Sequence, residues 1–221
     1  MSAVPATTTV GSLQNYLSRV YELDMACRVE DFLFTDENLA CRLEGEHFRA
    51  AGEKLLIHES ADELELSVYF DAAMLVRLDA SAPLVSIAAA DLRDFWTALE
   101  GVSHFLYLAW NAHYDRSVRG VELELQAEVD KYVITTMLVE EQQQTTAADI
   151  HTLLFERAQF DSGLADTLLA RYRDANRSAA KYCLSLARRF QPPHHPGRVR
   201  ELPRFYRRDH SAKLHFIEQQ H

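Results

Sequence analysis

The sequence predicts a mainly α-helical protein of the α+β type: a helical bundle with two long central helices, plus a small antiparallel β-hairpin or sheet in the N-terminal third. Helical periodicity runs from Asp91 to Glu141 and is interrupted only near Asp115–Gly120, which indicates two helices folded back on each other. An apolar stripe from Leu164 to Phe190 persists for about seven turns, as is typical of a bundle. With 7 glycines and 6 prolines in 221 residues, a loop-rich or many-stranded β architecture is disfavoured.

The composition is that of a globular protein with a core of its own. Hydrophobic residues make up 48% of the chain and charged residues 25%, which are ordinary values for this class. Changes in pattern divide the chain into a flexible N-terminus (1–9), an α+β region (10–83), a helical bundle (84–190) and a basic segment rich in proline, histidine and arginine (191–221).

The first predicted element is a short amphipathic helix that begins at Ser12, a residue type favoured as an N-cap. Phe32–Phe34 favours a short strand, and Asp36 then caps a helical turn that ends near Gly45. The apolar residues of the first helix are Leu13, Tyr16, Leu17, Val20 and Tyr21.

The clearest strand signal lies in two runs, Lys54–His58 and Glu63–Phe70, which together predict a hairpin. Apolar and polar residues alternate in the second run, so we expect one face in the core and the other in water. An isolated hairpin is only marginally stable, so either Phe32–Phe34 adds a third strand or helices cover the apolar face. Asp71 then caps a short helix, which Ser81–Pro83 ends.

The first central helix carries an apolar stripe that includes Trp96 and Trp110, which we interpret as core. Its opposite side is polar and rich in tyrosine. Tyr107, Asn111 and Tyr114 are the candidates there for contact with a partner. The second central helix is apolar over a wide arc, so we expect it in the middle of the bundle.

Three further helices are predicted after Glu141. Thr146 starts a capping-box pattern, and the helix that follows it stops near Phe160–Gly163. The long helix Leu164–Phe190 comes next, and the prolines of Gln191–Gly197 end it. A last short helix is capped by Asp209.

The net charge of -10 conceals an acidic body and a basic tail, because residues 186–221 carry +5 and the residues before them -15. An acidic body is repelled by phosphate backbones, which disfavours general nucleic-acid binding. The tail could grip single strands by pairing with phosphates and stacking on bases. Its apolar residues favour the other interpretation, in which it docks on the acidic body. The candidate anion-binding residues are Arg198, Arg200, Arg204, Arg207 and Arg208.

The cysteines give no sign of a disulfide framework. Cys27, Cys41 and Cys183 are widely spaced and form no CxxC pair, so neither disulfides nor a zinc knuckle is predicted. A secretory signal is not evident, and no apolar run approaches the length needed to span a membrane. We therefore expect a cytoplasmic protein without membrane contact.

One set of residues has the composition of a metal site. Glu100 and His104 lie one turn apart on the first central helix and would face Glu124 and Glu128 if the two helices pack antiparallel. Carboxylates and imidazoles on adjacent helices form the metal sites of bundles, so these four residues are candidate ligands of a divalent metal. The favoured alternative is a solvated charged face on which Glu128 pairs with Lys131.

No motif identifies a catalytic residue or a phosphate-binding loop. Ser103 and His104 are adjacent on a helix and point too far apart to act as nucleophile and base.

Three classes of function follow. The favoured one is a non-enzymatic cytoplasmic interaction or regulatory protein without a cofactor, which forms a two-fold homodimer through the tyrosine-rich face. The second is a metal-dependent bundle enzyme, and the third is a nucleic-acid-associated protein that acts through the basic segment.

Overall fold

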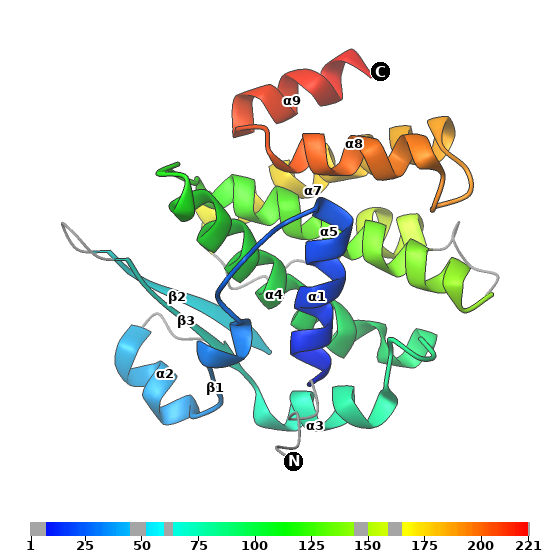
Figure 1. Ribbon diagram of the computed structural model, residues 1–221. Helices are drawn as coiled ribbons and strands as arrows, with labels where there is room; N and C mark the ends of the chain where they lie inside the picture. The colour runs from blue at the N-terminus through cyan, green and yellow to red at the C-terminus, as the bar shows by residue number, and fades with distance from the viewer. Residues whose placement is uncertain (1–7, 45–51, 60–63, 144–149, 159–164, 221) are drawn as a thin grey trace.

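The computed structural model describes residues 8–44, 52–59, 64–143, 150–158 and 165–220. The protein is mainly α-helical and has a small three-stranded sheet in its N-terminal part, as predicted. The sheet lies at one side of a helical body whose middle is formed by two long helices (Figure 1). In the described part of the chain, none of the helices combines the length and the apolar character that a membrane span requires.

The N-terminal helix α1 (Thr9–Tyr21) begins earlier than the sequence predicts, because Thr8 rather than Ser12 is its N-cap. The Thr8 side chain accepts a hydrogen bond from the Gly11 backbone N–H at 3.1 Å. Residues 1–7 of the segment predicted to be flexible lie outside the described residues. The apolar side of α1 packs on the first central helix, and a single 3-10 turn, η1 (Val29–Asp31), leads from α1 to the sheet.

The sheet contains β1 (Leu33–Phe34), β2 (Glu53–Glu59) and β3 (Leu64–Phe70) in the order β1-β3-β2. The hairpin partners β2 and β3 are antiparallel, whereas the third strand β1 pairs with β3 in parallel. Tyr69, on the side of β3 predicted to face water, is only 3% exposed. The reason is that β3 is the middle strand, and the Phe34 ring on β1 lies 5.7 Å from the Tyr69 ring.

Two short helices flank the sheet, and an aspartate begins each of them as predicted. Asp36 accepts from the backbone N–H of Asn38 and Leu39 at the start of α2 (Glu37–Glu44). Asp71 accepts from the Met74 N–H at the start of α3 (Ala72–Ser81). The predicted break follows α3 directly, with Ala82 in the left-handed region at φ 44°. Gly45, the predicted end of the first of these helices, lies outside the described residues.

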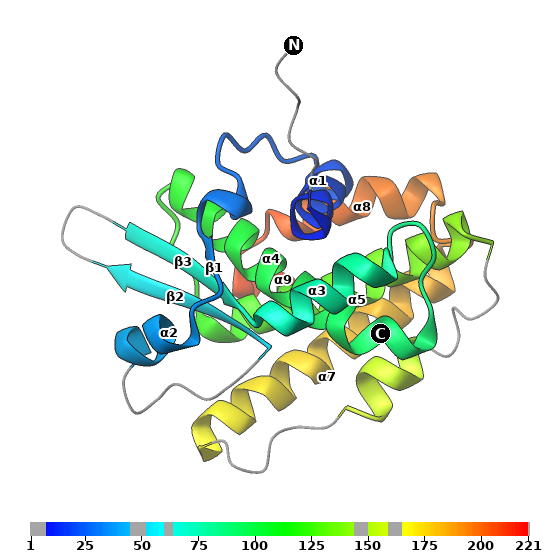
Figure 2. The same ribbon diagram turned by 90° about the horizontal axis from the view of Figure 1, so that it is seen from below.

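The helical body is built around α4 (Leu92–His113), α5 (Gly120–Glu141) and α7 (Asp166–Arg189). A 3-10 turn, η3 (Ala89–Asp91), leads into α4. Helix α5 packs against α4 on one side and α7 on the other, so it is buried around most of its circumference, as its wide apolar arc predicts (Figures 1 and 2). Between α5 and α7 only a π-helical turn, η4 (Thr152–Glu156), is described, and Thr146 lies outside the described residues.

The C-terminal segment forms two helices, α8 (Pro196–Tyr206) and α9 (His210–Gln219), of which the sequence predicts only the second. Both lie against the body, α8 beside α1 and α9 beside α7 (orange and red in Figure 1). The side chain of Arg207 donates to the carbonyl of Glu22 at 2.8 Å. Arg189 on α7 forms a two-point ion pair with Glu201 on α8. The basic segment is therefore a packed part of the fold.

Candidate functional site

A cluster of charged side chains lies where α4, α5, α7 and the start of β2 meet. We call it the charged cluster. Strand β2 contributes one residue, α4 two, α5 three and α7 one. Its members are Glu53, Glu100, His104, Glu124, Glu128, Lys131 and Arg171.

The charged cluster is not the solvated face that the sequence analysis favoured. Glu124 is 6% exposed and Lys131 8% exposed. The cause is tertiary, because α7 covers this side of α5 and brings Arg171 onto Glu124 at 3.2 Å. The four predicted metal ligands do come together in the structure: His104 and Glu124 are buried, and Glu100 and Glu128 are partly buried.

Two permanent cations hold most of the carboxylates. The Lys131 ammonium lies 2.5 Å from Glu100 Oε2 and 2.9 Å from Glu128 Oε1. The Arg171 guanidinium holds Glu124. These contacts satisfy the charges of α5 and leave the other side of the cluster, toward β2, less fully paired.

That side contains three potential metal ligands. One ligand atom each from Glu53, Glu100 and His104 lies within 4.8 Å of the other two. Metal–ligand bonds of about 2.0–2.2 Å place two opposed ligand atoms about 4.4 Å apart at most, so a small side-chain rotation closes the triad on an ion. We call these three residues the triad.

Two atoms of the triad are buried without a hydrogen-bond partner among the described residues: Glu53 Oε2 and His104 Nε2. The nearest carboxylate oxygen to His104 Nε2, Glu124 Oε2, is 3.5 Å away, an ion-pair distance that is too long for a good hydrogen bond. Leaving a buried polar atom without a partner costs free energy, so this pair marks a place where a water molecule or an ion would be stabilised.

Glu53 is the residue of this site that the sequence analysis missed. It lies at the first position of β2, and only the packing of β2 on α4 brings it to the triad. Gly101 makes that approach possible, because a Cβ at this position would lie 3.0 Å from Glu53 Oε2 and 2.7 Å from the Phe70 ring. The lone glycine within the central helix was the one signal in the sequence of a close approach by another element.

The buried environment shifts the protonation of the triad. Burial and the charge of Glu100 raise the pKa of Glu53 to about 7. Burial alone would lower the pKa of His104, but Glu124 and the charges of Glu53 and Glu100 outweigh it and raise this pKa to about 9. Burial would raise the pKa of Glu100, yet Lys131 and His104 lower it below its usual range.

Four carboxylates face the two permanent cations Lys131 and Arg171, and the raised pKa of His104 makes its imidazolium a third positive charge at neutral pH. A divalent ion held by Glu53, Glu100 and a neutral His104 would replace that proton, and its two charges would then balance the four carboxylates. The ligand types also fit, since two carboxylates and one imidazole suit Zn²⁺, Mn²⁺ or Fe²⁺.

The predicted interaction face is largely internal, which corrects the sequence analysis. Tyr107 is 1% exposed and Asn111 5% exposed, whereas Tyr114 is 54% exposed. Lys213 of α9 covers this part of α4, donating to the Tyr107 hydroxyl at 2.8 Å and to Gln126 Oε1 at 2.8 Å. The aromatic side of α4 is thus occupied by the chain itself. The homodimer prediction that depended on it stays untested.

The arginines of the alternative nucleic-acid site are also partly internal. Arg198 is 1% exposed and donates to Thr136 Oγ1 at 2.8 Å. Arg207 is bound to Glu22, and the Arg208 guanidinium lies 4.5 Å from the centre of the Phe216 ring. Arg200 and Arg204 remain exposed. The five residues therefore do not form one basic surface.

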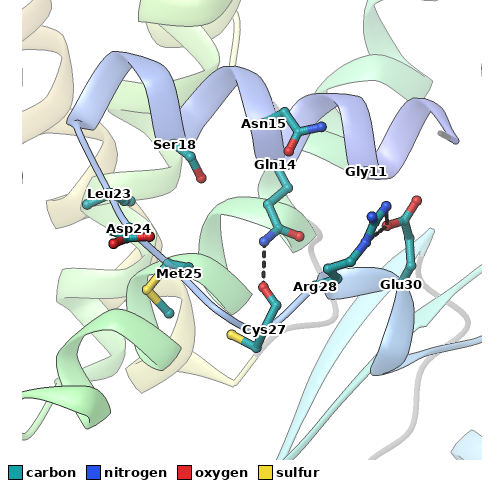
Figure 3. A pocket seen from close by; sticks show the side chains of 10 residues that line it. All are labelled: Gly11, Gln14, Asn15, Ser18, Leu23, Asp24, Met25, Cys27, Arg28 and Glu30. Atoms are coloured by element: carbon teal, nitrogen blue, oxygen red, sulfur yellow. Dashed lines mark hydrogen bonds and ion pairs between the residues drawn. The ribbon is translucent and has the colours of Figure 1, made fainter.

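A separate polar pocket of about 220 Å³ lies beneath α1, between this helix and the loop that follows it (Figure 3). Gln14 on α1 spans it, donating to the Cys27 carbonyl at 2.8 Å and accepting from the Val29 N–H at 2.6 Å. Arg28 at its edge pairs with Glu30. Its strongest polar groups are thus already satisfied within the chain, and the charged cluster is the better candidate site.

Comparison of the sequence with protein-family models and curated proteins gives no match, and comparison with solved structures gives none either.

Proposed function

We propose that this protein binds one divalent metal ion through Glu53, Glu100 and His104. The observation that carries the proposal is the pair of buried atoms without a partner among the described residues, Glu53 Oε2 and His104 Nε2, in one triad. An ion at this place would satisfy both atoms and replace the His104 proton as the positive charge beside Glu53 and Glu100.

The composition of the triad favours a reactive site over a structural one. Three protein ligands leave coordination positions for water or substrate, as in catalytic metal sites, whereas structural zinc sites are closed by four. We therefore rank a metal-dependent enzyme above an interaction protein. The proposal includes a cytoplasmic location, which is supported by the three cysteines, all in the described part of the chain and all unpaired.

Metal analysis of protein purified without chelator tests the proposal, together with thermal unfolding in chelator and after return of Zn²⁺, Mn²⁺ or Fe²⁺. We expect chelator to lower the melting temperature and one of these ions to restore it, because removal of the ion leaves like charges facing each other. His104→Ala should abolish this metal-dependent part of the stability.

His113→Ala is the matched control, since His113 is on the same helix but exposed. This variant should respond to chelator and metal as the unchanged protein does. A melting temperature that is the same in chelator and in each of the three ions rejects the proposal.

A further inference from the structure

We infer that Lys131 occupies the position of a second cation, so that the charged cluster is a two-cation site filled by one metal ion and one ammonium group. The inference rests on the proposed metal binding and specifies how many ions the site accepts.

The geometry of Glu100 carries this inference. The carboxylate of Glu100 belongs to the triad and also lies 2.5 Å from the Lys131 Nζ. It is thus shared between the proposed ion and the ammonium group. In two-metal sites a carboxylate is shared in the same way between two ions about 3.5–4 Å apart.

Lys131 also has its own second ligand, as a metal ion in that position would. Glu128 Oε1 lies 2.9 Å from Nζ, so the ammonium bridges α4 and α5. The Lys131 side chain is 10% exposed, so its ammonium is largely removed from water and depends on these two carboxylates for its partners.

The consequence is a site that takes one ion. With Lys131 and Arg171 in place, a single divalent ion completes the charge balance of the four carboxylates. A second ion would have to displace the ammonium from Glu100 and Glu128 and leave a buried, unpaired lysine, which is strongly unfavourable.

The test is the number of Mn²⁺ or Zn²⁺ ions retained per chain after dialysis, measured by elemental analysis. We expect about one ion in the unchanged protein and about two in Lys131→Met, since methionine fills the space of the lysine stem without its charge. Chelator should lower the melting temperature of Lys131→Met more than that of the unchanged protein, and metal should restore it.

A matched double variant separates the second site from non-specific binding. Lys131→Met with Glu128→Gln keeps the triad but removes the second ligand, and it should return to about one ion per chain. Lys131→Arg, which preserves the charge, should also bind about one.

The numbers of bound ions test metal binding by the triad and the role of Lys131 separately. An unchanged protein that binds no ion rejects the proposed function itself. If the unchanged protein binds one ion and Lys131→Met also binds one, Lys131 is only an ion-pair partner and the inference is wrong. A Lys131→Met chain that stays unfolded in saturating metal also overturns it, because the ion is expected to replace the ammonium.

Discussion

At the scale of single residues, Gly101 sets how closely β2 and β3 approach α4. Gly101→Ala would place a methyl group 2.7 Å from the Phe70 ring and 3.0 Å from Glu53 Oε2. Because both neighbours are packed, we expect a loss of about 1–3 kcal/mol in the free energy of unfolding, measured by urea denaturation. The same variant should bind metal more weakly, since Glu53 must move. An unchanged midpoint and unchanged affinity would show that the sheet yields freely here.

A neighbouring pair on β3 tests the burial pattern of the strand. Val68 is fully buried and Ser67 is partly exposed. Val68→Asp should lower the free energy of unfolding by more than about 3 kcal/mol, because it buries an unpaired charge. Ser67→Asp, the matched control, should cost less than about 1 kcal/mol. Equal urea midpoints for the two variants would contradict the assigned strand faces.

The grouping of Glu100 with His104 could be predicted from the sequence, because helical spacing places both on one side of α4. The grouping of Glu124 with Glu128 follows in the same way on α5. Their burial could not be predicted, since it depends on α7, which covers the cluster from a distant part of the chain. The sequence could not predict that Glu53 belongs to the site, for a related reason. Strand alternation assigns it a face, but only the packing of β2 against α4 decides which helix that face meets.

At the scale of elements, one buried lysine joins α9 to the body, beside the apolar contacts of Phe216 and Ile217. Lys213 is 0% exposed, and its ammonium lies 4.2 Å from the centre of the Tyr107 ring. Its direct hydrogen-bond partners, Tyr107 and Gln126, are neutral. Burial lowers the pKa of Lys213 to about 7, although nearby carboxylates oppose this. The carboxylates that act on Lys213 are Glu122, Asp130 and Asp209.

This lowered pKa predicts a pH dependence for the attachment of α9. Docked Lys213 releases its proton near pH 7, whereas an undocked lysine keeps it to about pH 10.4. Docking should therefore strengthen as pH rises from about 7 to 10, and the contribution of Lys213 should be constant at its lowest level below this window. Hydrogen exchange of α9 measured across this range checks the direction. Asp130, whose pKa burial raises to about 6, titrates below the window.

Lys213→Met should remove most of the rise while keeping α9 docked, because methionine suits the aromatic surroundings without a charge. Lys181→Met, at an exposed position on α7, is the matched control and should keep the rise. If exchange of α9 is independent of pH in the unchanged protein, Lys213 is not the fastening that the structure indicates.

Helix α8 shows why one element escaped the sequence analysis. Pro196 lies in its first turn, where proline is well tolerated, and Pro203 lies inside it. The prolines of this region predict a break after α7, and the apolar residues Leu202, Phe205 and Tyr206 predict only that the segment docks on the body. Their burial against the body is what stabilises the helix despite Pro203.

At the scale of the whole molecule, the bundle could be predicted because each long helix carries its own apolar pattern, and α5 was expected at the centre from its pattern alone.

The segment after Phe190 completes that bundle. Truncation after Phe190 should lower the urea midpoint and the solubility, because it uncovers Tyr21 and Tyr107, whose rings pack against Tyr206 of α8. The same truncation should leave affinity for single-stranded nucleic acid little changed. Steeply salt-dependent binding that disappears on truncation would instead show that the segment is a nucleic-acid-binding arm.

The contacts of Arg207 with Glu22 and of Lys213 with Tyr107 join residues 185 and 106 positions apart. A ribosome that adds about 5–20 residues per second needs roughly 10–40 seconds to pass from Glu22 to Arg207. After α4 has been synthesised and before α8 and α9 follow, the tyrosine-lined sides of α1 and α4 lack the helices that cover them. The nascent chain therefore exposes an aromatic surface that α8 and α9 bury in the folded protein.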